Sequence, residues 1–282
     1  GLFAELSKIK IPFAVSISSL TGYLDYNGSF DSGALVSTLG VFLLAGGSAA
    51  LNQYQEYHLD ARMNRTKNRP IPSGRFSSTN TLIFSIIVSL VGALILLFGN
   101  NLTACLIGLL TLLWYNGIYT PMKRKTVFAV LAGAFVGAFP PMIGWTAAGG
   151  YVFDTAIILI AMLLFIWQVP HFMVLASRHT PVGPDPVPFF TPPGLWNTAE
   201  RNIQILIWIS LYSLAVFLFI IKGGIAGHAF SVALAGMALV LPVGMAAFFK
   251  RCPVSKTATG FHAINLSMLF FMALGILDHL LV

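Results

Sequence analysis

The chain has 282 residues, of which 57% are hydrophobic and only 9% are charged, and its mean hydropathy is +0.83. A soluble domain with this composition would expose large apolar patches, so a soluble fold is excluded and lipid is the expected solvent. The two cysteines lie in segments of different character, so neither a disulfide nor a cysteine metal site is expected. Residues 1–10 lack the ordered regions of a signal peptide, and we expect no removable targeting segment.

The hydropathy pattern predicts nine membrane-spanning helices, because crossing a hydrocarbon core about 30 Å thick takes about 20 mostly apolar residues. The predicted spans are 11–26, 33–51, 81–98, 102–119, 127–147, 155–176, 203–221, 226–249 and 261–281. The first of them is short and rich in serine. The predicted fold class is therefore all-α, a polytopic membrane protein with about nine transmembrane helices around a central cavity.

Nine spans place the connecting segments alternately on two sides of the membrane. Of the 16 Lys and Arg residues, 15 then fall on the side of the N-terminus, and only Lys222 falls on the other side, with Asp25, Asp31, Asp154 and Asp278. By the positive-inside rule we predict a bacterial or archaeal cytoplasmic membrane, with the N-terminus and the active-site loops in the cytoplasm. Topology accounts for the net charge of +7, so no nucleic-acid partner is expected.

The connections after the second and sixth predicted spans are much longer than the turns on the acidic side, such as residues 99–101 and 148–150. Long loops in compact proteins tend to be functional. These two follow spans that are four apart in the chain. This spacing suggests that residues 1–282 form a single transmembrane domain built from two four-helix halves plus a ninth helix, with chemistry at the end of each half.

The segment after the second span carries three oxygen donors spaced by four residues, Asn52, Glu56 and Asp60. At about 100° per residue this spacing places all three on one stripe of a helix. Mg²⁺ prefers oxygen ligands, commonly takes one or two carboxylates and completes its shell with water and substrate phosphates. The stripe therefore predicts a magnesium site with Asp60, Glu56 and Asn52 as catalytic and metal-binding residues.

Cations follow this stripe directly in the sequence, and guanidinium groups suit bidentate contact with phosphate. We predict that they bind diphosphate; they are Arg62, Arg65, Lys67 and Arg69. A basic cytoplasmic loop is the alternative interpretation of these cations. It leaves the two carboxylates unexplained, because acidic side chains near a membrane span are costly and usually mark an ion or substrate path.

A second basic group follows the fourth span and contains Lys123 and Arg124. These side chains could reach the same diphosphate, or they could serve only as a topological anchor.

The sixth span contains Trp167, Gln168 and His171 beside a proline in an otherwise apolar helix. They could line an amphipathic acceptor pocket, or the histidine could be an ordinary interior residue.

Three sequence blocks between positions 52 and 176 follow one another in the order of a known family. They are Asn52-x3-Glu56-x3-Asp60 with the basic run to Pro70, Tyr119-Thr120-x2-Lys123-Arg124 leading to Gly144, and Trp167-Gln168-x-Pro170-His171-Phe172-x2-Leu175-Ala176. Together they resemble the intramembrane prenyltransferases of the UbiA superfamily and, more narrowly, the protoheme IX farnesyltransferase (heme O synthase) family. One element departs from the family pattern. Asp185 is the only carboxylate between Asp154 and Glu200, so the family's second acidic motif is not assigned to any residue here.

The resemblance implies an enzyme that uses Mg²⁺ to transfer a farnesyl group from farnesyl diphosphate to a vinyl group of heme B. Trp167, Gln168 and His171 would then belong to the heme pocket, and a terminal-oxidase heme-maturation protein would be a partner. One alternative keeps the fold but takes a quinone precursor or another aromatic acceptor. A membrane transporter or heme carrier is the alternative from another class, although such proteins usually bind substrate near the bilayer midplane.

Overall fold

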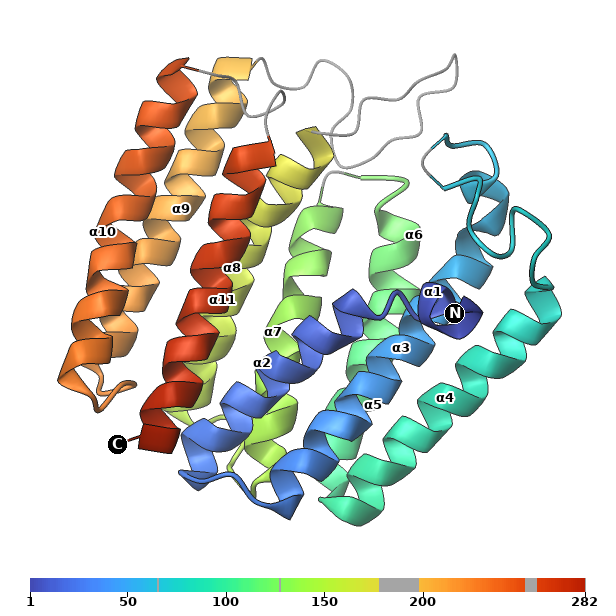
Figure 1. Cartoon of the computed structure of the whole chain (residues 1–282), viewed down its shortest axis with the longest axis horizontal. Helices are drawn as coiled ribbons and strands as arrows, with labels where there is room; N and C mark the ends of the chain where they lie inside the picture. Colours follow the sequence, from blue (N-terminus) through green and yellow to red (C-terminus); the bar gives the residue numbers. More distant parts are fainter. Residues whose placement is uncertain (65, 127, 178–197, 252–257, 282) are drawn as a thin grey trace. The chain divides into compact units, whose positions relative to one another are not determined.

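A computed structural model describes residues 1–64, 66–126, 128–177, 198–251 and 258–281 (Figure 1). Over these ranges the chain is helical and contains no strand. The helices are α1 (Leu2–Leu6), α2 (Lys10–Asn27), α3 (Ser32–Asp60), α4 (Ser78–Gly99), α5 (Leu102–Leu113), the π-helix η1 (Trp114–Tyr119), α6 (Thr120–Met122), α7 (Ala129–Ala147), α8 (Thr155–Ser177), α9 (Thr198–Ile221), α10 (His228–Arg251) and α11 (Ala258–Leu281).

Each predicted span coincides with a helix, and α5, η1 and α6 together form the fourth. In the part of the chain that the structure describes, eight helices are long and apolar enough to cross a membrane, and α2 is not among them. The reason is its polar content, because α2 contains Lys10, Asp25 and Asn27 near its ends and Ser16, Ser18, Ser19 and Thr21 in its middle. The all-helical polytopic fold is confirmed, with nine as an approximate number of spans.

Several helix ends are fixed by side chains that the sequence supplies at the first turn. Asp31 caps α3 by accepting from the Ala34 N–H at 2.9 Å, and Ser77 and Asn101 cap α4 and α5 in the same way. Such caps satisfy backbone donors that have no partner within the helix. At the other end of α3 the helix continues to Asp60, nine residues beyond the predicted span. The predicted stripe is therefore helical, and the connection after it is correspondingly shorter.

The described residues form two compact units. The N-terminal unit consists of residues 1–121 and 139–151, and the C-terminal unit consists of the rest. In the N-terminal unit, α3 and α4 run side by side (Figure 1), and α2 packs closely on the last part of α7. A Cβ at Gly22 would collide with the backbone of Pro141, and one at Gly144 would collide with the backbone of Ser19. Small residues permit this close approach of helix backbones in a membrane.

In the N-terminal unit, segments far apart in sequence meet at the ends of its helices. At one end, Gln53 of α3 donates to the carbonyl oxygens of Glu5 and Leu6, both at 2.8 Å. At the other end, Asn101 donates to the Thr146 carbonyl at 2.6 Å. The basic segments before α2 and after α3 therefore lie at the same end of this unit. This arrangement agrees with the predicted alternation of the connections.

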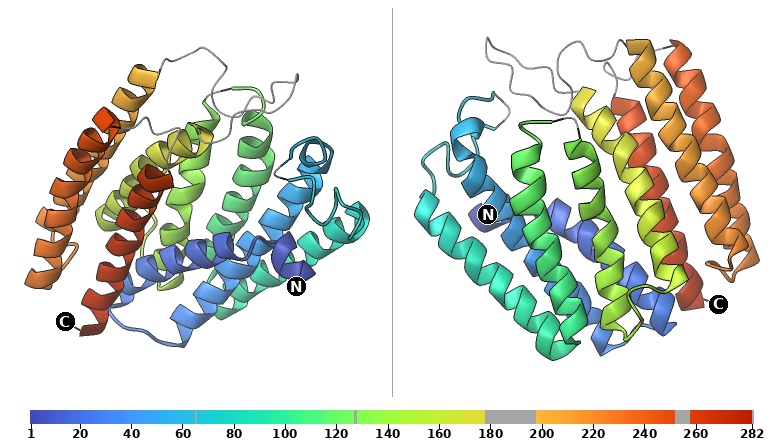
Figure 2. Two further views of the ribbon diagram at one scale, coloured as in Figure 1. Left: turned by 45° about the horizontal axis from the view of Figure 1, so that its top comes forward. Right: turned by 180° about the vertical axis from the view of Figure 1, so that it is seen from behind.

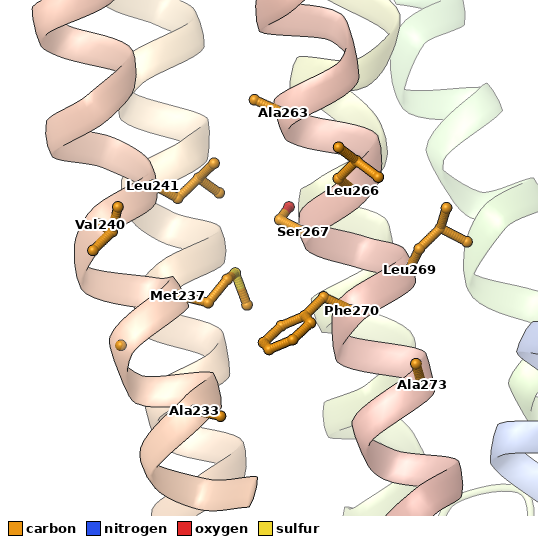
Figure 3. A pocket seen from close by; sticks show the side chains of 11 residues that line it. Ala233, Met237, Val240, Leu241, Ala263, Leu266, Ser267, Leu269, Phe270 and Ala273 are labelled. Carbon is orange, nitrogen blue, oxygen red and sulfur yellow. The ribbon is translucent and has the colours of Figure 1, made fainter.

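In the C-terminal unit, α9 packs against both α8 and α10, and α11 packs against α8 and α10 (Figure 2). Its buried core includes Val174, Ile205, Ile209 and Ile264. An open groove of about 690 Å³ lies between α10 and α11, where Met237 and Leu241 face Ser267 and Phe270 (Figure 3). Among the described residues that line this groove, Ser267 is the only one with a polar side chain, so the lining is almost entirely apolar. The prediction of one domain with two four-helix halves stays a prediction.

Candidate active site

The three predicted oxygen donors lie on the last turns of α3 and are withdrawn from solvent. Asn52, Glu56 and Asp60 are 1%, 8% and 4% exposed. Asn52 Nδ2 donates to Glu56 Oε2 at 3.0 Å, which holds the amide and the carboxylate together on one face of the helix. Buried carboxylates need partners, because an unpaired charge in a medium of low polarity is strongly unfavourable.

Two cations contact the stripe, one at a carboxylate and one at the amide. Arg69 Nη1 donates to Asp60 Oδ2 at 2.6 Å, and Lys8 Nζ donates to Asn52 Oδ1 at 3.0 Å. Lys8 has a φ of 49°, a left-handed backbone conformation that is uncommon outside glycine. Arg69 is one of the cations predicted at the site, whereas Lys8 is one of the 15 cations that the sequence places on the side of the N-terminus. The sequence gives no local signal for the role of Lys8, because 44 residues separate it from Asn52.

Helix α1 holds Lys8 in place. Leu6 is fully buried against Ala50 and Ile71, and Gln53 binds the carbonyl oxygens of Glu5 and Leu6. Glu5 also forms an ion pair with Arg75 at 2.9 Å, although both side chains are about half exposed. An ion pair at that exposure adds little stability. The buried leucine and the amide contacts therefore account for the position of this segment.

The π-helix η1 and the short helix α6 contact α3 beside the stripe. Asn116 of η1 accepts from Ser48 Oγ at 2.6 Å and donates to Gln55 Oε1 at 3.1 Å. Thr120 accepts from Asn52 Nδ2 at 3.2 Å. Single-turn π-helices within α-helices frequently occur at functional sites. Sequence reasoning missed Asn116, although an asparagine inside an apolar span is a signal that could have identified it.

The other predicted diphosphate ligands are placed as follows. Arg62 and Lys67 are exposed on the segment after α3, and Arg65 lies outside the described residues. Lys123 is buried and Arg124 is half-buried. Both belong to the C-terminal unit, and their role at a diphosphate stays a prediction. Arg69, one of the cations predicted from the sequence, is bonded directly to the stripe through Asp60.

The predicted acceptor residues lie on α8, in the C-terminal unit. Trp167 Nε1 donates to the Ile264 carbonyl at 2.8 Å, and His171 Nδ1 lies 2.7 Å from Asn265 Oδ1. The Trp167 and His171 ring centroids are 5.0 Å apart. Gln168 points instead toward α7, where a Cβ at Gly137 would lie 2.8 Å from its Oε1. The structure thus brings Trp167 and His171 together with α11 and directs Gln168 elsewhere. Asp185 lies outside the described residues.

The stripe suits a hard divalent cation by its chemistry. Two carboxylates and an amide oxygen are the donor set that Mg²⁺ accepts while it keeps water or phosphate ligands. Within the described ranges no cluster of three His, Cys, Asp or Glu residues could hold a metal, so a softer site made of those residues is not present there. Binding at Asn52 Oδ1 or at Asp60 Oδ2 would compete with the contacts to Lys8 and Arg69.

Comparison with known proteins gives consistent results. The model of the UbiA prenyltransferase family matches residues 14–274. A protein named protoheme IX farnesyltransferase from Oleidesulfovibrio alaskensis is 36% identical over 98% of this chain and 96% of its own length. The one from Nitratidesulfovibrio vulgaris is 34% identical over 87% and 84%.

Solved structures share the fold at low sequence identity. A digeranylgeranylglyceryl phosphate synthase superposes with a TM-score of 0.78 at 16% identity, covering 100% of this chain and 98% of the other. A UbiA homologue from Archaeoglobus fulgidus bound to GPP and Mg²⁺ gives a TM-score of 0.71 at 12% identity, with both chains covered completely.

Proposed function

The chain belongs to the UbiA prenyltransferase family, and we propose from this that it transfers the farnesyl group of farnesyl diphosphate to a vinyl group of heme B, producing heme O. The observation that carries the proposal is the buried stripe of Asn52, Glu56 and Asp60 with cations bonded to it. A carboxylate stripe and adjacent cations match the two halves of a metal-diphosphate group. The names of the relatives supply the two substrates.

Asn52, Glu56 and Asp60 would hold Mg²⁺, which supplies neutralisation of diphosphate charge when it is bound. Arg69 and Lys8 carry fixed positive charge at the two ends of the stripe. We propose that they turn to the diphosphate oxygens as these gain negative charge, assisted by Arg62, Arg65, Lys67, Lys123 and Arg124. Preformed positive charge of this kind lowers the barrier most where water is excluded, and the stripe is buried.

The proposed farnesyl transfer breaks one C–O bond of farnesyl diphosphate and forms one C–C bond and one C–O bond on the vinyl group. The C–O bond of farnesyl diphosphate breaks, and the diphosphate leaves with the electron pair. The π electrons of the vinyl group form a new C–C bond to the allylic cation. Water then adds to the resulting cation on the porphyrin side chain and loses a proton, which leaves a hydroxyethylfarnesyl group. The protein must therefore exclude water from the first cation and admit one molecule to the second.

The acceptor site is proposed at Trp167, Gln168 and His171. Aromatic rings at this part of α8 suit the flat face of a porphyrin, and the described part of the C-terminal unit provides the apolar surroundings. The charge asymmetry further supports a cytoplasmic membrane with the N-terminus and the diphosphate site on the cytoplasmic side. A terminal-oxidase heme-maturation protein is the proposed recipient of the product.

The test is a reconstituted reaction. Purified protein in nanodiscs is incubated with Mg²⁺, farnesyl diphosphate and heme B, and the porphyrin is analysed by mass spectrometry. We expect a product heavier than heme B by one farnesyl group and one hydroxyl group, and none after chelation of Mg²⁺.

Two results would contradict the proposal. If heme is unchanged and a quinone precursor such as 4-hydroxybenzoate is prenylated, the acceptor is a quinone precursor and not heme B. Unchanged heme and intact farnesyl diphosphate, together with heme movement across a proteoliposome membrane, would indicate a carrier.

A further inference from the structure

The imidazole of His171 is held by Asn265 of α11, a residue that nothing in the sequence pattern singles out. Nδ1 of the imidazole lies 2.7 Å from Oδ1 of the Asn265 side chain. The amide group of Asn265 is oriented by a second bond, in which Nδ2 donates to the Phe261 carbonyl oxygen at 2.9 Å. A carbonyl oxygen can only accept, so the NH₂ group must face Phe261 and the oxygen must face the histidine.

This orientation determines which nitrogen of the imidazole carries the proton. Since Oδ1 only accepts, Nδ1 of His171 must be the donor, and the neutral ring then has its lone pair on Nε2. A histidine whose Nδ1–H is bonded to an oxygen acceptor and whose Nε2 is unprotonated has the form that binds metals in proteins.

Aromatic side chains hold the ring on several sides. The ring centroids of Trp167, Phe172 and Phe261 lie 5.0, 5.5 and 5.2 Å from that of His171. Trp167 is itself fixed through its bond to the Ile264 carbonyl at 2.8 Å. The imidazole is thus oriented by α8 and α11 together, which is more than a histidine needs merely to be satisfied inside a membrane.

We propose that His171 Nε2 is the axial ligand of the heme iron of the acceptor substrate and that Asn265 is the positioning residue that fixes its tautomer and direction. This inference rests on the proposed function and names the contact by which the acceptor is recognised. A neutral amide makes the imidazole a weaker electron donor than a carboxylate partner would. A moderate iron–nitrogen bond is appropriate for a substrate that has to leave after the reaction.

The test compares heme B with protoporphyrin IX, which has the same side chains but no iron. Both are titrated into the nanodisc-embedded protein, and the ratio of their affinities is measured. An axial bond contributes only to heme, whereas a structural role of His171 or Asn265 would affect both ligands equally. We expect wild type to prefer heme and His171→Ala to lose the preference. In Asn265→Leu the preference should fall by about 10-fold or more, the scale of the loss when a residue that orients a metal ligand is removed.

Matched variants separate the contact from packing. Asn265→Asp keeps the acceptor oxygen and should restore the preference for heme, with slower turnover because heme leaves more slowly. Tyr212→Phe removes another contact to α11, the bond from the Tyr212 hydroxyl to the Ser267 carbonyl at 3.4 Å, and should leave the ratio unchanged. The inference would be overturned if the ratio of the heme affinity to the protoporphyrin IX affinity were the same in His171→Ala as in wild type.

A measurement on wild type avoids the possibility that a variant misfolds. When heme iron has a histidine ligand, its ferrous nitrosyl complex shows hyperfine splitting from the histidine nitrogen in the EPR spectrum. We expect the triplet of ¹⁴N to become a doublet when only histidine is labelled with ¹⁵N, and an unchanged spectrum would overturn the axial contact. If the label appears but no farnesylated porphyrin forms, the proposed function fails while this inference stands.

Discussion

The stripe of α3 and the imidazole cluster of α8 and α11 place polar side chains inside a membrane protein in different ways. At the stripe two carboxylates are buried, and one of them, Asp60, is bonded to the cation Arg69. Around His171 the contacts are neutral hydrogen bonds and aromatic rings. Charged pairs can exchange partners when a charged ligand arrives, whereas neutral bonds fix one geometry. The first arrangement suits a metal-diphosphate group, and the second suits a flat, largely apolar acceptor.

The largest effect that we expect is the loss of turnover in Asp60→Ala, by at least about two orders of magnitude, which is the scale for removal of one electrostatic partner of a developing charge. Heme binding, followed by its optical spectrum, should stay at the wild-type level, because the heme contacts proposed here involve α8 and α11. Conversely, His171→Ala should retain Mg²⁺-dependent binding of farnesyl diphosphate. Loss of heme binding in Asp60→Ala would show that the two regions do not divide the substrates as proposed.

A smaller effect is expected for Arg69→Ala, a decrease of about 10-fold in kcat/KM. In the proposed mechanism Arg69 exchanges its bond to the buried Asp60 for one to the leaving diphosphate, and one charge-assisted hydrogen bond contributes about 1.5 kcal/mol. Arg62→Ala removes an exposed cation of the same segment, one of several proposed to assist at the diphosphate, and should lower kcat/KM less than Arg69→Ala does. Steady-state kinetics of the two variants give the comparison. Equal losses would mean that the segment acts through its total charge.

Hydropathy and spacing predicted the helices, the helical stripe and the position of the basic segments, because these depend on the local sequence. The contacts that complete both regions are not local. Lys8 meets Asn52 across 44 residues, and His171 meets Asn265 across 94. The sequence around Lys8 is explained equally well by membrane topology. Asn265 is a polar residue in an apolar span, but the local sequence does not show which residue it contacts. Only the packing of α1 on α3, and of α11 on α8, decides these roles.

Lys8 offers a test of the idea that the charged region exchanges partners. Its ammonium group occupies an oxygen of Asn52 that Mg²⁺ would use, so Lys8→Met should lower the Mg²⁺ concentration for half-maximal activity. We expect a shift of about fivefold, since a repulsion of about 1 kcal/mol between two hydrated cations has that effect. Titration of activity with Mg²⁺ measures it, and Lys10→Met is the matched control on an exposed neighbour. A higher Mg²⁺ requirement in Lys8→Met would indicate that the lysine serves the diphosphate alone.

The smallest effect concerns Asp31, which caps the N-terminus of α3, at the opposite end of the helix from the stripe. Its pKa is lowered by the hydrogen bond from the Ala34 N–H and then by the Tyr23 hydroxyl. A lowered pKa in the folded state stabilises the protein above the ordinary value of 3.8. This contribution is lost as the pH falls below that value toward the folded-state pKa. Asp31→Asn should therefore melt slightly below wild type at pH 7, and the difference should shrink as the pH falls below 3.8, measured by thermal denaturation in detergent. Since asparagine also caps helices, the difference reports the charge alone. Turnover of Asp31→Asn should equal that of wild type. This result would show that Asp31 only caps α3, in contrast to Glu56 and Asp60, which are proposed to bind Mg²⁺.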